Sequence, residues 1–448
     1  MSDLLRIGAQ GVAAYRGALS TIGDNVANAE TKGYSRRDVK LSETAILGPG
    51  QPLYNNIAAV GGVKVSAIDR AWDAFKTADA RRASADSARA DAQVRWLTVA
   101  ETALDDSDTG VSARLTHFYA AADTLAADPG GTAPRRGMLI ALEGVTKAMT
   151  LSAEGLANAS AGIGAEAQTA TAAITNDLHA LADVNTAIRR VASGTTARAQ
   201  LEDERDRLLD SLNDNVSIDV TLNDAGMATV RANGPGGPLL LDGLTPALVE
   251  YRMADDGRLS MSTTIHSETS TLTPSGGTMA GLVDSARSIA DRRQTLDTIA
   301  NDFAAQLNAW STGGVDKNGA AGQPLLAGTG AAGLTVAITD PAQVAAGKAG
   351  GAANGNLLLL KDQRTAGGAE ARSADLVTDL AQQLASVRTQ SGALSIRRDN
   401  ALAARDDVSG IDLDREAAEL LRYQQAYDGS AKILQVARET MQSILNLF

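Results

Sequence analysis

The chain has 448 residues and a formal net charge of −12, with 44% hydrophobic but only 3% aromatic residues. It contains no cysteine, which excludes disulfides, thiolate metal sites and cysteine nucleophiles. The negative charge argues against a general binder of nucleic acid or of anionic membranes, because both need clustered positive charge. The length is enough for about two to four compact domains.

No segment has the pattern of a cleaved secretory signal or of a membrane span. The first residues, MSDLLR, are not a basic region followed by a long apolar run. No window reaches the roughly 18 consecutive apolar residues of a spanning helix. We therefore expect no membrane insertion, and either a cytoplasmic location or export by a route that needs no cleaved signal.

The first 30 residues have the spacing of a helix that packs along one face. Apolar or small residues recur every seven positions in two neighbouring rows, which is a heptad pattern over about four repeats. The first row is Leu5, Val12, Leu19 and Val26, and the second is Gly8, Tyr15, Ile22 and Ala29. The helix should end near Gly33, and the Gly- and Pro-containing stretch that follows to residue 62 should be extended.

The interior of the chain alternates between helical and strand-like patterns. Residues 72–105 lack Gly and Pro, and apolar residues keep helical spacing over 115–125 and 163–212, which predicts long helices. From residue 215 the period changes to two, and alternating runs separated by turns predict a small antiparallel β domain over 215–275. Helical spacing returns at 282–310 and from 373. The Gly- and Ala-rich segment between them contains two short strand candidates, 334–338 and 357–360.

The last 36 residues repeat the heptad pattern of the first segment. The row consists of Leu413, Leu420, Tyr427, Leu434, Met441 and Phe448. A terminal helix with a long apolar row needs a helical partner. The two ends could pair within one molecule, pack against other subunits, or do both. Since a terminal helix without a partner frays, we expect both ends to be disordered before assembly.

These patterns predict a mainly α fold with inserted β structure (α+β) that is elongated and has several domains. Residues 1–40 and 409–448 would form a terminal helical domain resembling a coiled coil. Residues 41–214 and 276–408 would form a long-helix domain with an insert near 313–370. Residues 215–275 would form an outer β domain, so the chain leaves the terminal domain and returns to it.

Motifs for catalysis or cofactor binding are weak or absent in the sequence. Residues 328–333, GTGAAG, match a dinucleotide-binding fingerprint, but a strand rather than a helix is expected after them, so we interpret the match as a flexible loop. The three histidines, His117, His179 and His266, lie far apart. We therefore predict no catalytic residue, no cofactor and no metal site, and we expect that the protein is not an enzyme.

Short segments at both ends resemble one known family. Residues 24–36, DNVANAETKGYSR, resemble the N-terminal signature of flagellar rod, hook and hook-associated proteins, and the Tyr34-Ser35-Arg36 ending is similar to that of hook-associated members. Residues 409–427 resemble the C-terminal signature of the same family, and residues 201–209, LEDERDRLL, resemble an internal segment. Asp24 and Arg37 depart from the usual residues, and the chain is short for the family, so the outer β region should be reduced.

The resemblance implies a structural protein of the bacterial flagellum, exported by the flagellar type III apparatus and needed for motility. Such subunits would assemble with copies of themselves as a junction between hook and filament. Partners would be the hook protein, a second junction protein on the filament side and an export chaperone. Besides the two heptad rows, Asn25, Asn28, Gly33 and Tyr34 would belong to the assembly interface, with Asn and Gly suited to the change from helix to extended chain.

Two alternatives stay open at this point. A flagellar hook or rod structural protein should turn to β structure soon after the N-terminal signature, whereas this sequence continues with helices. A cytoplasmic coiled-coil scaffold, from a different functional class, should have folded ends and should never leave the cell. Detection of the protein in culture medium would separate the flagellar interpretations from the scaffold.

Overall fold

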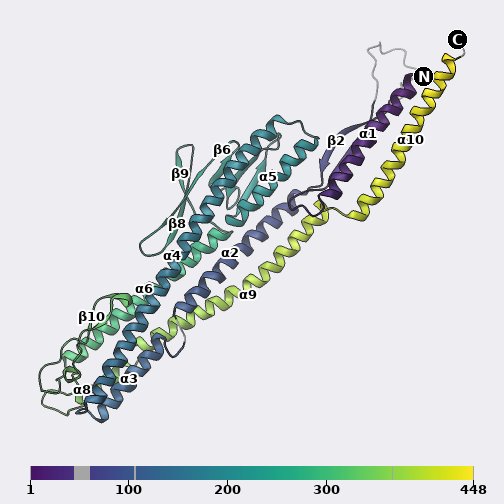
Figure 1. Cartoon of the computed structure of the whole chain (residues 1–448). Helices are drawn as coiled ribbons and strands as arrows, with labels where there is room; N and C mark the ends of the chain where they lie inside the picture. The colour runs from purple at the N-terminus through teal and green to yellow at the C-terminus, as the bar shows by residue number, and fades with distance from the viewer. Residues whose placement is uncertain (1, 45–60, 105–106, 366, 447–448) are drawn as a thin grey trace.

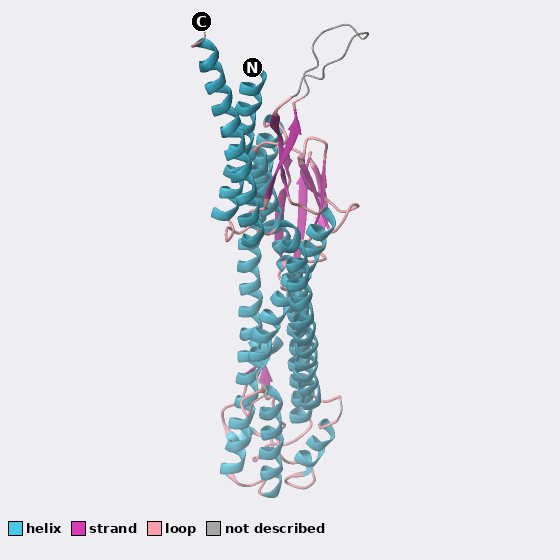
Figure 2. Ribbon diagram, turned by 90° about the vertical axis from the view of Figure 1, so that its right-hand side faces the viewer, coloured by secondary structure: helices cyan, strands magenta, loops and turns pink. Residues whose placement is uncertain are grey.

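The computed structural model describes the chain except residues 1, 45–60, 105–106, 366 and 447–448. Figure 1 shows an elongated molecule in which both chain ends lie together at one end. Seen from the side in Figure 2, long helices run along the whole length and most strands lie beside them. The mainly α fold with inserted β structure is therefore confirmed.

The two terminal helices form an antiparallel pair, here called the terminal pair. Helix α1 spans Ser2–Ala27 and helix α10 spans Leu413–Leu445, and they pack along each other within one chain (Figure 1). Beside α1 lies an antiparallel hairpin of β1 (Arg37–Glu43) and β2 (Val63–Arg70). Both ends thus have a partner before assembly, contrary to the expectation of disordered ends. The expected extended stretch falls mostly on residues 45–60, outside the described residues.

The long helices form one bundle. It consists of α2 (Ala74–Leu104), α3 (Val111–Ala127), α4 (Thr132–Arg190), α5 (Thr196–Asn215), α6 (Thr278–Thr312) and α9 (Ala369–Ser409). Helix α2 packs along α9 through small residues such as Ala80, Ala83 and Ala401. The apolar rows expected over 163–188 and 282–310 are buried in the main core, as Ile163, Ile174 and Leu296 show.

Polar caps define two of the helix starts. The Thr195 hydroxyl accepts a hydrogen bond from Arg198 N at the start of α5. The Asp412 carboxylate accepts bonds from the backbone N–H groups of Asp414 and Arg415 at the start of α10. Each side chain satisfies amides that have no partner inside their helix. The cap at Asp412 therefore separates α10 from α9.

The β region contains two small antiparallel sheets on one side of the bundle (Figure 1). The first has the order β3 (Ile218–Leu222), β4 (Ala228–Ala232), β5 (Leu239–Asp242) and β6 (Thr245–Pro246). The second consists of β7 (Leu248–Met253), β8 (Leu259–Ile265) and β9 (Glu268–Leu272). The alternating runs therefore form the expected hairpins, with Val220 opposite Val230 and Tyr251 opposite Met261.

The Gly- and Ala-rich insert lies at the end of the molecule far from the termini (Figure 1). It contains β10 (Leu326–Ala327), α7 (Gly330–Gly333), β11 (Thr335–Val336), η1 (Pro341–Gln343), α8 (Gly355–Leu360) and η2 (Lys361–Gln363). The strand candidate at 334–338 is reduced to two residues, and the one at 357–360 is wrong because it is helical. Leu357 and Leu360 are buried while the two leucines between them are exposed, which is helical spacing.

Candidate assembly interface

Small residues bring the two helices of the terminal pair close together. A methyl group at Gly8 would lie 2.9 Å from Cγ of Leu434, and one at Gly11 would lie 3.0 Å from Cβ of Ser430. The rings of Tyr15 and Tyr423 also meet, with centroids 6.2 Å apart. The face of α1 that packs on α10 is therefore the Gly8 side, which the second apolar row marks in the sequence.

The first predicted row of α1 lies at the edge of this contact. Leu5, Val12 and Leu19 are half-buried, and Val26 is 44% exposed. On the other flank of α1, Gly17 packs on Val65 of strand β2. With 3.6 residues per turn, the row of Leu5 lies nearly opposite Gly17, so neither α10 nor the hairpin covers it fully.

The predicted row of α10 turns toward α1 in the middle of the helix and is exposed at its ends. Leu420, Tyr427 and Leu434 are half-buried, whereas Leu413 is 55% exposed and Met441 is 44% exposed. Phe448 lies outside the described residues. A straight helix drifts about 20° per heptad, which moves such a row gradually around the axis.

A further set of apolar residues on α10 escaped the sequence analysis. Leu421 is 59% exposed, Val436 is 58% exposed and Ile433 is 41% exposed; we call these three residues the outer row. They lie off the heptad row and away from α1. Counting apolar residues on every side of the predicted helix, and not only along one row, could have found them. A helix that is apolar on more than one side needs a second partner.

The signature residue Asn25 is buried at the end of the terminal pair and connects three elements. Its side-chain amide donates hydrogen bonds to the backbone oxygen of Arg37 and to Oε2 of Glu416, both at 3.0 Å. Its Oδ1 accepts bonds from Arg37 N and from the Tyr34 hydroxyl, also at 3.0 Å. All of these contacts are internal, so Asn25 itself offers no free surface to another subunit.

The other signature residues support this arrangement. Burial raises the pKa of Tyr34 to about 12, although Arg37 opposes the shift, so the hydroxyl keeps the proton that it donates to Asn25. The Arg37 guanidinium lies over the Tyr34 ring, 4.4 Å from its centroid. Gly33 has a φ of 85°, which favours glycine at this turn. Asn28 donates to the backbone oxygen of Asp24 and remains near the surface.

Arginines and carboxylates join the terminal pair and its hairpin to the bundle. Asp203 of α5 accepts from Nη2 of Arg37 at 3.0 Å and from Nε of Arg70 at 2.8 Å. Asp206, one turn further, accepts from Nη2 of Arg70 at 2.9 Å. Arg81 of α2 and Arg405 of α9 both bind Asp210, at 2.7 and 2.9 Å. We call the six residues from both sides of this contact the joint cluster: Arg37, Arg70, Arg81, Asp203, Asp206 and Asp210.

The pKa values of two residues in the joint cluster follow from their opposite charges. Burial alone would raise the pKa of Asp206, but Arg205, Arg70 and Arg81 outweigh it and hold that pKa below its ordinary value. Burial alone would lower the pKa of Arg70, but Asp206, Asp203 and Glu202 outweigh it and raise that pKa. Both side chains are therefore charged at neutral pH.

Acid should weaken the joint cluster. The folded-state pKa of Asp206 is depressed, so its contribution to stability is present above the unfolded value of roughly 3.9 and is lost as the pH falls through the lower folded value. Asp214 should change the stability in the opposite direction with pH, because burial raises its pKa and its protonation therefore favours the folded state. We therefore expect Asp206→Asn to lower the melting temperature at pH 7 and to reduce its decrease between pH 4 and pH 2 relative to the parent. Parallel melting curves of parent and variant over this pH range would contradict the assignment.

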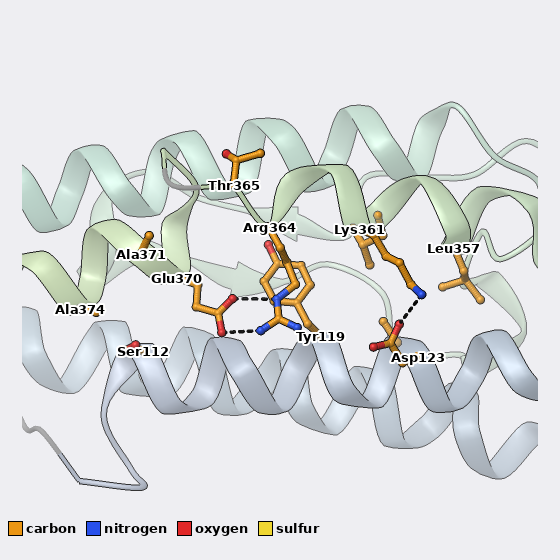
Figure 3. A pocket seen from close by; sticks show the side chains of 12 residues that line it. Ser112, Tyr119, Asp123, Leu357, Lys361, Arg364, Thr365, Glu370, Ala371 and Ala374 are labelled. Carbon is orange, nitrogen blue, oxygen red and sulfur yellow. Dashed lines mark hydrogen bonds and ion pairs between the residues drawn. The ribbon is translucent and has the colours of Figure 1, made fainter.

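A cavity far from the terminal pair lies between α3, α8 and the start of α9. Its volume is about 690 Å³, and Figure 3 shows its lining. Arg364 binds Glu370 through two hydrogen bonds of 2.8 and 2.7 Å and lies over the Tyr119 ring. Lys361 faces Asp123 at 3.9 Å. The charged side chains of this cavity therefore pair with one another, and these pairs connect the insert to helices α3 and α9.

Comparisons with known proteins point to one family. The model of the flagellar hook-associated protein FlgK helical domain matches residues 97–326, slightly more than half of the chain. The chain belongs to the flagellar hook-associated protein family. It is thus a structural protein of the bacterial flagellum. A second model, the C-terminal region of flagellar basal body rod proteins, matches residues 407–447.

Individual relatives agree with this assignment. Flagellar hook-associated protein 1 of Escherichia coli is 23% identical, with full coverage of both chains. The protein of the same name from Bacillus subtilis is 24% identical over 97% of this chain and 96% of its own length. The flagellar hook junction protein FlgK from Burkholderia pseudomallei has a solved structure that matches with a TM-score of 0.51 and 18% identity. That match covers 56% of this chain and 46% of the other, and it supports the fold alone.

The described residues contain neither a candidate metal site nor a membrane-spanning helix. No group of three or more His, Asp or Glu side chains within them is arranged to hold a metal ion. None of the helices they form is both long and apolar enough to cross a membrane.

Proposed function

We propose that this chain is a subunit of the junction between the flagellar hook and the filament, and that its terminal pair packs against neighbouring subunits there. The observation that carries the proposal is the outer row. Leu421 and Val436 are each more than half exposed on a helix whose other side already packs on α1. Exposed apolar side chains on a helix face that no other part of the described chain covers favour contact with another subunit.

Only some of the other residues predicted for the assembly interface lie on exposed surface of the terminal pair. Val26, Leu413 and Met441 are exposed, and they add apolar area at the ends of the pair. Leu420, Tyr427 and Leu434 face α1, so their contribution to assembly would be indirect, through the shape of the pair. Asn25 and Tyr34 would act in the same indirect way, because their polar groups bind within the chain.

In this proposal the terminal unit comprises α1, the hairpin and α10. The sequence-based boundary at residue 40 falls inside strand β1, whose partner β2 contacts α1, so the unit would extend to residue 70. The bundle would surround it with the β region outside. The partners would be other copies of this chain, the hook protein, a second junction protein on the filament side and an export chaperone. We infer a structural role without catalysis.

The bundle favours a junction subunit over a hook or rod protein. Helices α2–α5 follow the hairpin directly, and the family match over 97–326 includes most of them. The match over 407–447 does not discriminate, because its description names rod proteins. A cytoplasmic scaffold accounts less well for the outer row, because it names no partner that would cover these exposed apolar residues.

Deletion of the gene tests the proposal. The strain should make hooks without filaments and release filament subunits into the medium, and the wild-type gene should restore filaments. Gold-labelled antibodies against the β region should bind a short zone between hook and filament. A deletion strain with attached filaments, or a complementing protein found only inside the cell, would reject the proposal.

A further inference from the structure

The contact between the terminal unit and the bundle is polar. Among the described residues, neither the main apolar core nor the smaller cluster of Ala80, Ala83 and Ala401 includes any residue of α1, β1, β2 or α10. The chain passes between the two parts only at residues 70–74 and 409–413. Parts of a chain that share no large apolar interface are expected to move relative to each other unless something else holds them.

Asp203 is the residue that holds both strands of the hairpin. Its two carboxylate oxygens bind different arginines, Oδ2 binding Arg37 of β1 and Oδ1 binding Arg70 of β2. The side chains of Arg37 and Arg70 are 3% and 6% exposed and that of Asp203 is 12% exposed, so water screens these ion pairs little. The planar guanidinium group of arginine donates hydrogen bonds in fixed directions, so a buried arginine–carboxylate pair orients its partners as well as attracting them.

The two arginines bound by Asp203 make further hydrogen bonds, one set within the terminal unit and one set with the bundle. On one side, Arg37 binds Asn25, and Asn25 binds Glu416 of α10. On the other side, Arg70 binds Asp206, which lies on the same face of α5 as Asp203. Two backbone bonds lie beside this path, Ile68 N to Gly194 O at 2.9 Å and Arg36 N to Ser409 O at 2.8 Å.

We propose that Asp203 is a positioning residue that fixes the orientation of the terminal unit on the bundle. Its loss should free the terminal unit to turn as one body about residues 70–74 and 409–413, while α1 still packs on α10 and the bundle keeps its core. The inference concerns orientation within one chain, so it holds or fails independently of the proposed function.

The lack of cysteine makes the test clean, because introduced cysteines are the only sites for spin labels. One pair, Gln425→Cys with Gln382→Cys, places exposed labels on α10 and α9, across the joint. A second pair, Gln168→Cys with Gln382→Cys, places both labels on the bundle. Double electron–electron resonance on the full-length protein then gives the distance distribution for each pair.

The variant is Asp203→Asn, which keeps the size of the side chain and one acceptor oxygen but removes the charge. The control is Glu204→Ala, which removes a neighbouring carboxylate of α5 that pairs with Arg207 at the surface. We expect Asp203→Asn to lose the single narrow distance across the joint and to retain the narrow distance within the bundle. Glu204→Ala should retain both narrow distances.

Two results would overturn the inference. An unchanged narrow distance across the joint in Asp203→Asn would show that other contacts fix the orientation. Broadening of both distances would show that Asp203 supports the fold of the bundle rather than the position of the terminal unit. Asp203→Ala, measured in the same way, extends the test to a variant without any acceptor.

Discussion

Replacement of Leu421 and Val436 with aspartate is expected to abolish filament attachment and to leave the melting temperature of the purified protein unchanged. Both side chains are more than half exposed in the isolated chain, so the charges cost little there. In an assembled junction each residue would lose roughly 1.5–3 kcal/mol of apolar burial, and each unpaired carboxylate would add a desolvation cost. The measurements are thermal melting of the purified variant and counts of attached filaments.

Leu434→Asp is the matched control for this double variant. It introduces the same charge on the same helix, but Leu434 packs on Gly8 of α1 within the chain. It should therefore destabilise the terminal pair itself, which would appear as a lower melting temperature or as faster hydrogen exchange in α1 and α10. If the double variant destabilised the purified protein as Leu434→Asp does, or if filaments still attached normally, the outer row would not be an assembly surface.

Phe303→Ala should cause the largest loss of stability in the bundle, about 3–5 kcal/mol. Phe303 is 1% exposed, and its ring meets that of Phe118 edge to face at 5.9 Å and 89°. The sequence contains only four phenylalanines, so few other large side chains can fill the space. Urea unfolding followed by circular dichroism gives the change in the free energy of unfolding.

Phe75→Ala controls for the substitution itself. Phe75 lies in the first turn of α2 and is 81% exposed, so its removal should change the free energy of unfolding by less than about 0.5 kcal/mol. Similar losses of unfolding free energy in the two variants would show that Phe303 is not packed in the bundle core as described.

The architecture could be predicted from the sequence where a periodic pattern is long. The heptad rows at both ends and the change to period two at residue 215 each gave the correct type of element, because the period of an apolar pattern differs between a helix and a strand. The short run at 357–360 could not be assigned in this way. Four apolar residues fit a strand and a helix equally well, and only the burial of Leu357 and Leu360 distinguishes them.

The details of the candidate site were harder to predict, because they depend on which of several faces a partner covers. The row of Leu5 is more apolar than the row of Gly8, yet α10 packs on the Gly8 side, since small residues permit a closer approach. The sequence did contain a pattern that indicates the carboxylates of the joint cluster. Asp203, Asp206 and Asp210 are spaced three and four apart, which places three carboxylates on one helical face. Their arginine partners come from distant segments, which no local pattern identifies.

The central claim is that the outer row contacts another subunit in the flagellum, and photo-crosslinking from residue 436 tests it most directly. A benzophenone amino acid in place of Val436 should give no intermolecular product in the dilute purified protein. In isolated flagella the same position should link this chain covalently to a second flagellar subunit, which mass spectrometry can identify. Absence of any intermolecular product from flagella that contain the labelled chain would contradict the claim.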